Sequence, residues 1–299
     1  MFADTSRSEP GRMAVDPDTT RANAPTPSLS LARVRVDGGV AVTFANRGGR
    51  TIASDYSERD GYKLRTPRGG VMTQAAIINT GGGVAGGDTV GIEVHAEQNA
   101  KAAISMPAAE KVYASLGNGM TTVDVSLRLE AASRIDWLPQ ETIVFNHARL
   151  ARTISADLAP DARALIAETV VFGRTARGEQ VDDCHFQDTW RIRRGGRLFF
   201  AENIALSGDV SAQLAKPAVG NGACVMTTLL LASPDASDRI DAVRRALGPT
   251  IAGVHTGASA WNDMLVVRLL ASKGGPVRAL VEQLVPLLSD QPLPRVWAN

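Results

Sequence analysis

The sequence predicts a mainly β protein, and three observations support this prediction. Short apolar runs that alternate with polar residues recur at roughly ten-residue spacing. Gly, Pro, Asn or Asp separates most of these runs, and helical periodicity appears only near the C-terminus. Such strands are typical of a sandwich, a barrel or a β-helix-like stack rather than of alternating βα units. We find no repeat of fixed period.

The N-terminal part of the chain divides into a tail and the first strands. Residues 1–28 contain Asp, Thr, Ser, Arg and Pro with almost no large apolar side chains, so we expect a disordered tail that cannot bury enough surface to order itself. Residues 29–299 are expected to form a single β-rich domain. Alternation over residues 29–44 around Asp37-Gly38-Gly39 predicts a hairpin, and the polar segment 47–61 predicts a loop.

The central part of the chain carries the strongest strand signals. Val123, Val125, Leu127 and Leu129 alternate with polar residues, which indicates a strand with one packed and one solvated face. The segments 190–193 and 198–205 flank a glycine turn at 194–197 and predict a hairpin. Further strands are expected over residues 71–79, 90–94, 101–106, 134–138, 142–145, 149–158, 164–172, 223–232 and 264–270.

Helix signals come late in the chain. Residues 237–247 have apolar side chains at helical spacing, an acidic start, a basic end and Gly248-Pro249 as a stop. Residues 277–288 carry one apolar stripe, in which Pro286 should end or kink the helix. The sequence therefore predicts about two helices, both toward the C-terminus.

Composition argues against several classes of partner. The chain has 32 basic and 31 acidic residues and a net charge of +1, so no summed field draws it to nucleic acid or to an anionic membrane. Cys184 and Cys224 are far apart and predict neither a disulfide framework nor a zinc site. With no apolar signal segment and no apolar run long enough to span a bilayer, we expect a soluble cytoplasmic protein.

The most unusual stretch is T-G-G-G-V-A-G-G-D at residues 80–88. Glycine loops can bind phosphate through backbone N–H groups, but no G-K-[ST] follows this one. Val90, Ile92 and Val94 continue it as a strand rather than as a helix. We therefore expect a tight strand-to-strand turn in which Asp88 hydrogen-bonds the backbone.

Four further carboxylates stand close to strand ends or turns: those of Glu110, Glu141, Glu168 and Glu179. Separated carboxylates bind divalent metals weakly. Their spacing alone favours a plainer interpretation, in which they are solvated or pair with the nearby Arg149, Arg152, Arg174 and Arg177. The four histidines lack metal-site spacing, and no G-x-S-x-G elbow supports a hydrolase.

Seven motifs occur in a characteristic order. They are N-T-G-G-G (79–83) with G-G-D (86–88), A-A-E-K-V-Y (108–113), W-L-P-Q-E-T-I-V-F (137–145), F-G-R-T-A-R-G-E (172–179), D-T-W-R-I (188–192), G-R-L (196–198) and L-P-R-V-W (293–297). Any one of them is a weak signal. In this order they resemble the urease accessory protein D family, whose member is called the H protein in some bacteria. The match runs from about residue 29 to the C-terminus and excludes the tail.

The resemblance implies a chaperone and scaffold without catalysis of its own. It implies stacked, β-helix-like antiparallel and mixed sheets with about two helices. It also implies binding to apo-urease and to the F accessory protein, which recruits the GTPase G, so that nickel enters urease in a GTP-dependent process. No tightly bound cofactor is implied, only nickel in transit through an internal water-filled passage, where weak oxygen ligands would let the ion leave.

Particular residues follow from the same resemblance. It implies transient nickel contacts at Asp88, Glu110, Glu141, Glu168 and Glu179. It implies structural or partner-binding roles for Gly82, Gly83, Gly86, Gly87, Tyr113, Trp137, Arg174 and Trp297.

Two other interpretations remain open at this point. A β-helical carbohydrate-active enzyme could use separated carboxylates as acid and base. It would need an aromatic-lined cleft, however, and aromatic residues make up only 5% of the chain. A β scaffold without any metal role is the third possibility.

Overall fold

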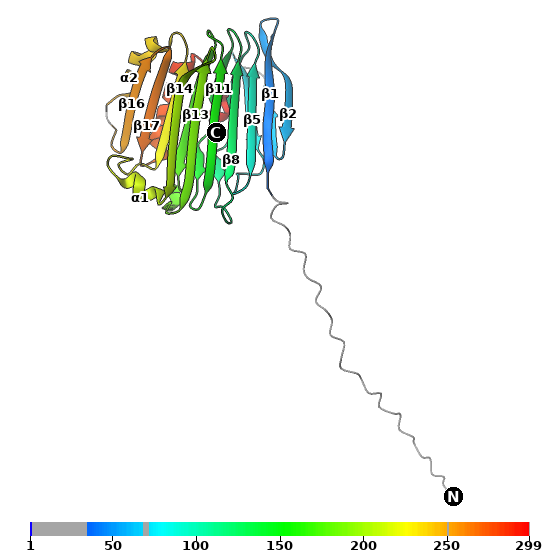
Figure 1. The fold of residues 1–299 in the computed structure, drawn as a ribbon, viewed down its shortest axis with the longest axis vertical. Coiled ribbons are helices and arrows are strands. Elements are labelled where there is room, and N and C mark those ends of the chain that lie inside the picture. Colours follow the sequence, from blue (N-terminus) through cyan, green and yellow to red (C-terminus); the bar gives the residue numbers. More distant parts are fainter. Residues whose placement is uncertain (2–34, 68–71, 250, 299) are drawn as a thin grey trace. The chain divides into compact units, whose positions relative to one another are not determined.

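The computed structural model describes residue 1 and residues 35–67, 72–249 and 251–298. Two mixed β-sheets enclose the main hydrophobic core of the unit Arg35–Asn299 (Figure 1). The first sheet contains β1 (Asp37–Arg47), β2 (Arg50–Arg59), β5 (Thr89–Ala96), β8 (Thr121–Leu129), β11 (Arg149–Leu158), β13 (Cys184–Arg194) and β14 (Arg197–Gly208). Their order across the sheet is β14-β13-β11-β8-β5-β1-β2.

The second sheet has ten strands. It contains β3 (Tyr62–Arg65), β4 (Thr73–Asn79), β6 (Lys101–Ser105), β7 (Glu110–Val112), β9 (Arg134–Leu138), β10 (Thr142–Val144), β12 (Arg163–Phe172), β15 (Val225–Ala232), β16 (Val254–Trp261) and β17 (Met264–Ala271). The main path runs β16-β17-β15-β12-β9-β6-β4-β3, and β7 and β10 lie beside it.

The chain winds between the two sheets as a β-solenoid. It passes from β5 to β6, from β8 to β9 and from β11 to β12, and each coil pairs in parallel with the next. Equivalent positions therefore stack as columns of buried side chains. One column in the first sheet consists of Val40, Ile92, Val125, Ile154 and Trp190. One in the second consists of Ala75, Ile104, Trp137, Ile166 and Leu230.

Antiparallel strands close both ends of this parallel stack. At one end β2 pairs with β1 and β3 pairs with β4. At the other end β14 pairs with β13, while β15, β17 and β16 extend the second sheet. Because the chain reverses direction at each end, the outermost parallel strands pair with an antiparallel neighbour instead of leaving their backbone N–H and C=O groups unpaired.

A third, shorter ladder forms one corner of the solenoid. β7, β10 and the last residues of β12 pair in parallel, and Val84 bridges to Val112. The result is a column of buried side chains, Val84, Val112, Val144 and Phe172. The loops that follow these four positions consequently lie side by side.

Three α-helices complete the fold. α1 (Val210–Ala215) follows the first sheet, and α2 (Ile240–Leu247) and α3 (Gly274–Ser289) build a second core against the end of the second sheet. Short 3-10 turns occur at η2 (Thr175–Arg177), η3 (Ala236–Arg239) and η4 (Arg295–Ala298). No helix in the described part of the chain is long and apolar enough to cross a membrane.

The predicted class is confirmed: the fold is mainly β, with stacked mixed sheets and helices toward the C-terminus. The hairpin at residues 190–205 is the β13–β14 pair, and η3 and α2 together match the helix expected at 237–247. Pro286 does not end the last helix, which continues to Ser289. Apart from residue 1, the predicted tail, residues 1–28, lies outside the described residues.

Two predictions for the first strands were wrong. The hairpin turn expected at residues 37–39 is the beginning of the single strand β1, and residues 29–34 lie outside the described part. Gly39 is required by close packing rather than by a turn, because a Cβ at this position would lie 1.9 Å from the carbonyl oxygen of Gly91 on β5. The loop expected at 47–61 contains β2, an edge strand whose mostly exposed polar side chains conceal the strand pattern.

Candidate functional site

A small interior cavity of about 40 Å³ lies between the two sheets. Its polar lining includes Tyr62, Glu110, Arg152 and Glu168, and apolar strand residues such as Ile92 form much of the rest. A space of this size holds a few species the size of a water molecule. Two of the five predicted carboxylates, Glu110 and Glu168, therefore line the same cavity.

Glu168 belongs to a buried ion cluster, which we name the Arg152 cluster: Arg152, Glu168 and Asp188. Arg152 on β11 forms ion pairs with Glu168 on β12 and with Asp188 on β13. Its Nε and Nη2 donate to the two Asp188 oxygens at 3.0 and 2.6 Å. Trp137 Nε1 donates to Glu168 Oε1 at 2.7 Å. One cation thus holds two carboxylates inside the core.

The pKa values follow from this packing. Burial raises the pKa of Glu168, with Arg152 opposing the rise. Burial disfavours the charged form of Arg152 as well, but Asp188 and Glu168 outweigh it and raise the pKa of the guanidinium. Arg152 therefore stays positively charged, and this charge compensates the two buried carboxylates beside it.

Glu110 is held differently, in what we name the Glu110 cluster: Glu110, Asn79 and Tyr62. Asn79 Nδ2 donates to Glu110 Oε1 and Oε2 at 3.0 and 3.2 Å, and Tyr62 donates its hydroxyl to Oε2 at 3.2 Å. No described residue forms an ion pair with this carboxylate. Burial is the main reason that the pKa of Glu110 is raised, and burial likewise raises the pKa of Tyr62.

Asp88 closes the glycine turn, as its position in the sequence predicts. Its buried carboxylate accepts the backbone N–H groups of Val36 at 2.9 Å and of Ala85 at 2.7 Å. Gly83 and Gly86 are required by close packing, because a Cβ would lie 2.4 Å from the Tyr113 ring at Gly83 and 1.9 Å from the Ser115 hydroxyl at Gly86. Gly82 and Gly87 adopt positive φ angles of 77° and 94°.

Several of the motif residues meet at the corner formed by the short ladder. Tyr113 donates its hydroxyl to the Gly82 carbonyl at 3.0 Å and packs edge-on against Phe145, with ring centroids 5.1 Å apart. The Arg174 guanidinium lies 4.7 Å from the Phe145 ring centroid and pairs with Glu179 at 2.8 Å. The bond to Arg174 lowers the pKa of Glu179.

The C-terminal motif ties the end of the chain to the solenoid. Trp297 is buried, its Nε1 donates to the Leu138 carbonyl at 3.1 Å, and Arg278 lies over its ring at 5.4 Å. Arg278 also donates to Gln140 Oε1 at 2.7 Å and lies 3.5 Å from Glu141. Glu141 therefore belongs to this C-terminal anchor rather than to the interior cavity.

The five predicted carboxylates do not form one site. Glu110 and Glu168 share the cavity, whereas Asp88, Glu141 and Glu179 lie in a turn, an anchor and a surface corner. Two of the arginine pairings expected from the sequence are present, Arg152 with Glu168 and Arg174 with Glu179. Among the described residues no three His, Cys, Asp or Glu side chains are grouped to hold a metal ion.

Sequence reasoning missed three members of the two interior clusters, Tyr62, Asn79 and Asp188. Asn79 and Asp188 stand inside motifs, but neither was assigned a role. Their contacts span 31 and 36 residues of sequence. For Asp188 the available signal was its place in the alternation of β13, where it lies on the same face as the buried Phe186 and Trp190, because a buried polar group requires a partner.

Comparison with known proteins gives a consistent result over nearly the whole chain. The family model described as UreD urease accessory protein matches residues 36–298. The chain is 44% identical to urease accessory protein UreD 2 of Methylorubrum populi, over 93% of this chain and 95% of that protein. It is 42% identical to urease accessory protein UreD of Xanthobacter autotrophicus, over 93% and 97%, and 40% identical to that of Azorhizobium caulinodans, over 93% and 99%.

Proposed function

Because this chain belongs to the UreD urease accessory protein family, we propose that it is the scaffold of a complex that inserts nickel into apo-urease. It is an accessory protein of urease maturation rather than an enzyme. In the proposed complex it binds apo-urease together with the F and G accessory proteins, and the G protein supplies the GTP-dependent step. We propose that it works in the cytoplasm as one β-rich domain, residues 29–299, preceded by a disordered tail, residues 1–28.

The observation that carries the proposal is the family match across the whole solenoid, from residue 36 to residue 298. The match covers the strands that build both interior clusters as well as the C-terminal anchor. It also sets aside the carbohydrate-active enzyme, since a urease accessory protein acts on another protein. A β scaffold without a metal role remains the alternative to be tested.

Within this function we propose Glu110 as a transient contact for nickel. Glu110 lies on the interior cavity, where neutral side chains donate to it and no described residue forms an ion pair with it. A divalent ion would supply the missing positive charge, and oxygen ligands would bind it weakly enough to release it. Glu168 is a poorer candidate because Arg152 already neutralises it. Asp88, Glu141 and Glu179 are engaged in structural contacts away from the cavity.

The test of the scaffold role is reconstitution with apo-urease, the F and G proteins, nickel and GTP. We expect urease activity and bound nickel to depend on this chain, and full activation in its absence would refute the role. Glu110→Gln separates nickel transit from assembly. This variant should still co-purify with its partners while the nickel content of urease, measured by mass spectrometry, falls several-fold.

Glu93→Gln is the matched control for Glu110→Gln. Glu93 lies on β5 with an exposed side chain, so the same chemical change occurs away from the cavity. The control should load nickel normally. Equal loading by both variants would show that the Glu110 carboxylate is dispensable and would favour a scaffold without a metal role.

A further inference from the structure

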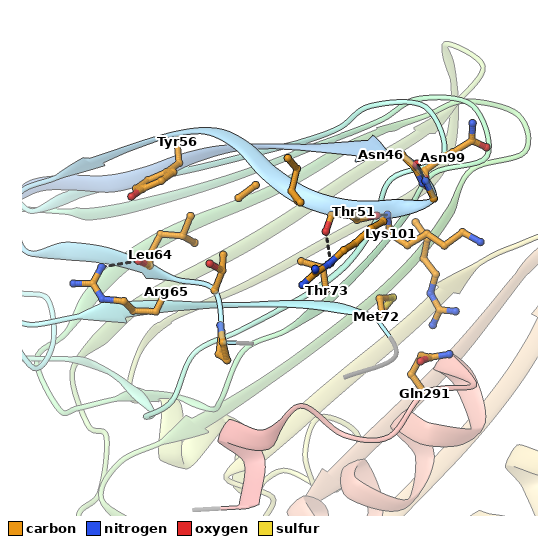
Figure 2. A pocket seen from close by; sticks show the side chains of 17 residues that line it. Asn46, Thr51, Tyr56, Leu64, Arg65, Met72, Thr73, Asn99, Lys101 and Gln291 are labelled. Carbon is orange, nitrogen blue, oxygen red and sulfur yellow. Dashed lines mark hydrogen bonds between the residues drawn. The ribbon is translucent and has the colours of Figure 1, made fainter. Parts of the chain in front are cut away.

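A second and far larger cavity, of about 1230 Å³, lies at the end of the solenoid where the first coil begins. Residues of β2, β3 and β4 form its walls, and Asn99, Lys101 and Gln291 lie at one side (Figure 2). Among the described residues, none lines both this cavity and the interior cavity that contains Glu110. What binds here is therefore a separate question from nickel transit.

The charge of this large cavity has one sign. Arg50, Arg65, Lys101 and Arg134 line it, and the described lining contains no Asp or Glu. Arg134 is paired with Asp136 at 2.7 Å and Arg65 with Glu58 at 3.2 Å. Arg50 and Lys101 form no ion pair with any described residue. The cavity thus carries at least two cations that remain available to an anionic ligand.

The cavity also lies beside two sheet edges. In the described part of the chain β2 pairs only with β1, and β3 pairs only with β4, so each is the last strand of its sheet. At Thr51 the β2 edge is bonded to the second sheet, because the Thr73 hydroxyl on β4 donates to the Thr51 carbonyl at 2.6 Å and the Lys101 backbone N–H on β6 donates to the Thr51 hydroxyl at 2.8 Å. A terminal strand offers backbone groups to which an extended peptide can add.

The size of the cavity decides between a small anion and a peptide. Pockets that hold one small ligand measure about 300–1,000 Å³, and this cavity exceeds that range. A nucleic acid is disfavoured because Tyr56 is the one aromatic side chain in the described lining and single-stranded recognition uses stacking on several. We propose that this cavity binds an extended acidic peptide segment of a partner protein. Its carboxylates face Arg50 and Lys101, and its backbone lies along the β2 or β3 edge.

The test uses the full chain and fluorescently labelled peptides. A peptide of alternating Glu and Thr should bind, binding should weaken as salt is added, and a peptide of equal length with Lys in place of Glu should not bind. The double variant Arg50→Glu/Lys101→Glu should bind the acidic peptide at least about tenfold more weakly, because like charges then face each other. Fluorescence anisotropy measures all of these affinities.

Arg128→Glu is the matched control, since Arg128 is an exposed side chain on β8 away from this cavity. It should bind the acidic peptide as the wild type does. If thermal melts show that the double variant is unfolded, Arg50→Glu alone replaces it, because Arg50 is an exposed residue at the start of β2. Three results would overturn the proposal: no binding of the acidic peptide, equal binding by the charge-reversed variant, or displacement of the peptide by inorganic phosphate at equal affinity, which would assign the site to small anions.

Discussion

The Arg152 cluster and the Glu110 cluster both contribute residues to the lining of one cavity and hold their carboxylates in opposite ways. In the Arg152 cluster a fully buried guanidinium binds two carboxylates, and Trp137 adds a further donor. In the Glu110 cluster an amide and a phenol donate to a single carboxylate, with which no described residue forms an ion pair. Both carboxyl groups have raised pKa values, with burial as the principal cause in each.

The difference separates a structural role from a binding role. A buried carboxylate with its own cation is a fixed part of the core, and removing either partner leaves an uncompensated charge. A buried carboxylate held by neutral donors retains its affinity for a proton or a metal ion. The contrast can be tested by removing one partner from each cluster in turn.

The largest effect is expected from Arg152→Met. The substitution removes the only cation of a cluster that contains two buried carboxylates, so the free energy of unfolding should fall by about 3–5 kcal/mol. Urea titration followed by circular dichroism measures the change. The exposed Arg128→Met should have little effect. A loss for Arg152→Met no larger than that of Arg128→Met would mean that the cluster contributes nothing net to stability.

Glu110→Gln should have a smaller effect, of opposite sign. Because burial raises the pKa of Glu110 above its usual 4.5, the folded chain retains this proton at pH values where the unfolded chain has released it. The wild type therefore loses stability as the pH rises from 4.5 through the folded pKa. The glutamine variant lacks this titration and should become progressively more stable than the wild type over that window.

Melting temperatures measured from pH 4.5 to 8 check this expectation. Glu93→Gln should show no such divergence from the wild type, because its carboxylate is exposed. A parallel pH dependence of Glu110→Gln and the wild type would contradict the description of Glu110 as a buried group without a cation.

Glu179→Gln is expected to give the smallest change. Its carboxylate is largely covered and accepts two bonds from the Arg174 guanidinium and one from the Arg174 backbone N–H, but the Arg174 side chain is exposed, and solvent screens such pairs. The amide can still accept one hydrogen bond from Arg174. A thermal melt should be indistinguishable from that of the wild type. A large drop in melting temperature would mean that this pair, like the Arg152 cluster, contributes substantially to stability.

Much of the fold was predictable from local pattern. The alternation at Val125, Leu127 and Leu129 gave the strand and its packed face, and the paired glycines gave the β13–β14 turn. The prediction failed where the identity of a residue is explained by a neighbour that is distant in the sequence. Gly39 is small because Gly91 approaches it from the adjacent strand, and β2 is polar because it is an edge.

The site was predictable only in part, for a related reason. The sequence identified Glu110 and Glu168 as candidates alongside three other carboxylates, and nothing in their spacing ranks the five. Parallel stacking brings Arg152 beside Asp188 through the β11–β13 register, and it brings Asn79 to Glu110 across 31 residues of sequence. These partners decide which carboxylate is already neutralised.

The sequence by itself determined the β class, the late helices, the glycine turn closed by Asp88 and the family motifs, because each depends on residues close together in the chain. The tertiary structure alone decided which carboxylates are buried and which have a cation. Burial and charge compensation depend on the side chains that successive coils place against one another, and those side chains are tens of residues apart in sequence. Glu110 therefore differs from Glu168 only in the folded molecule.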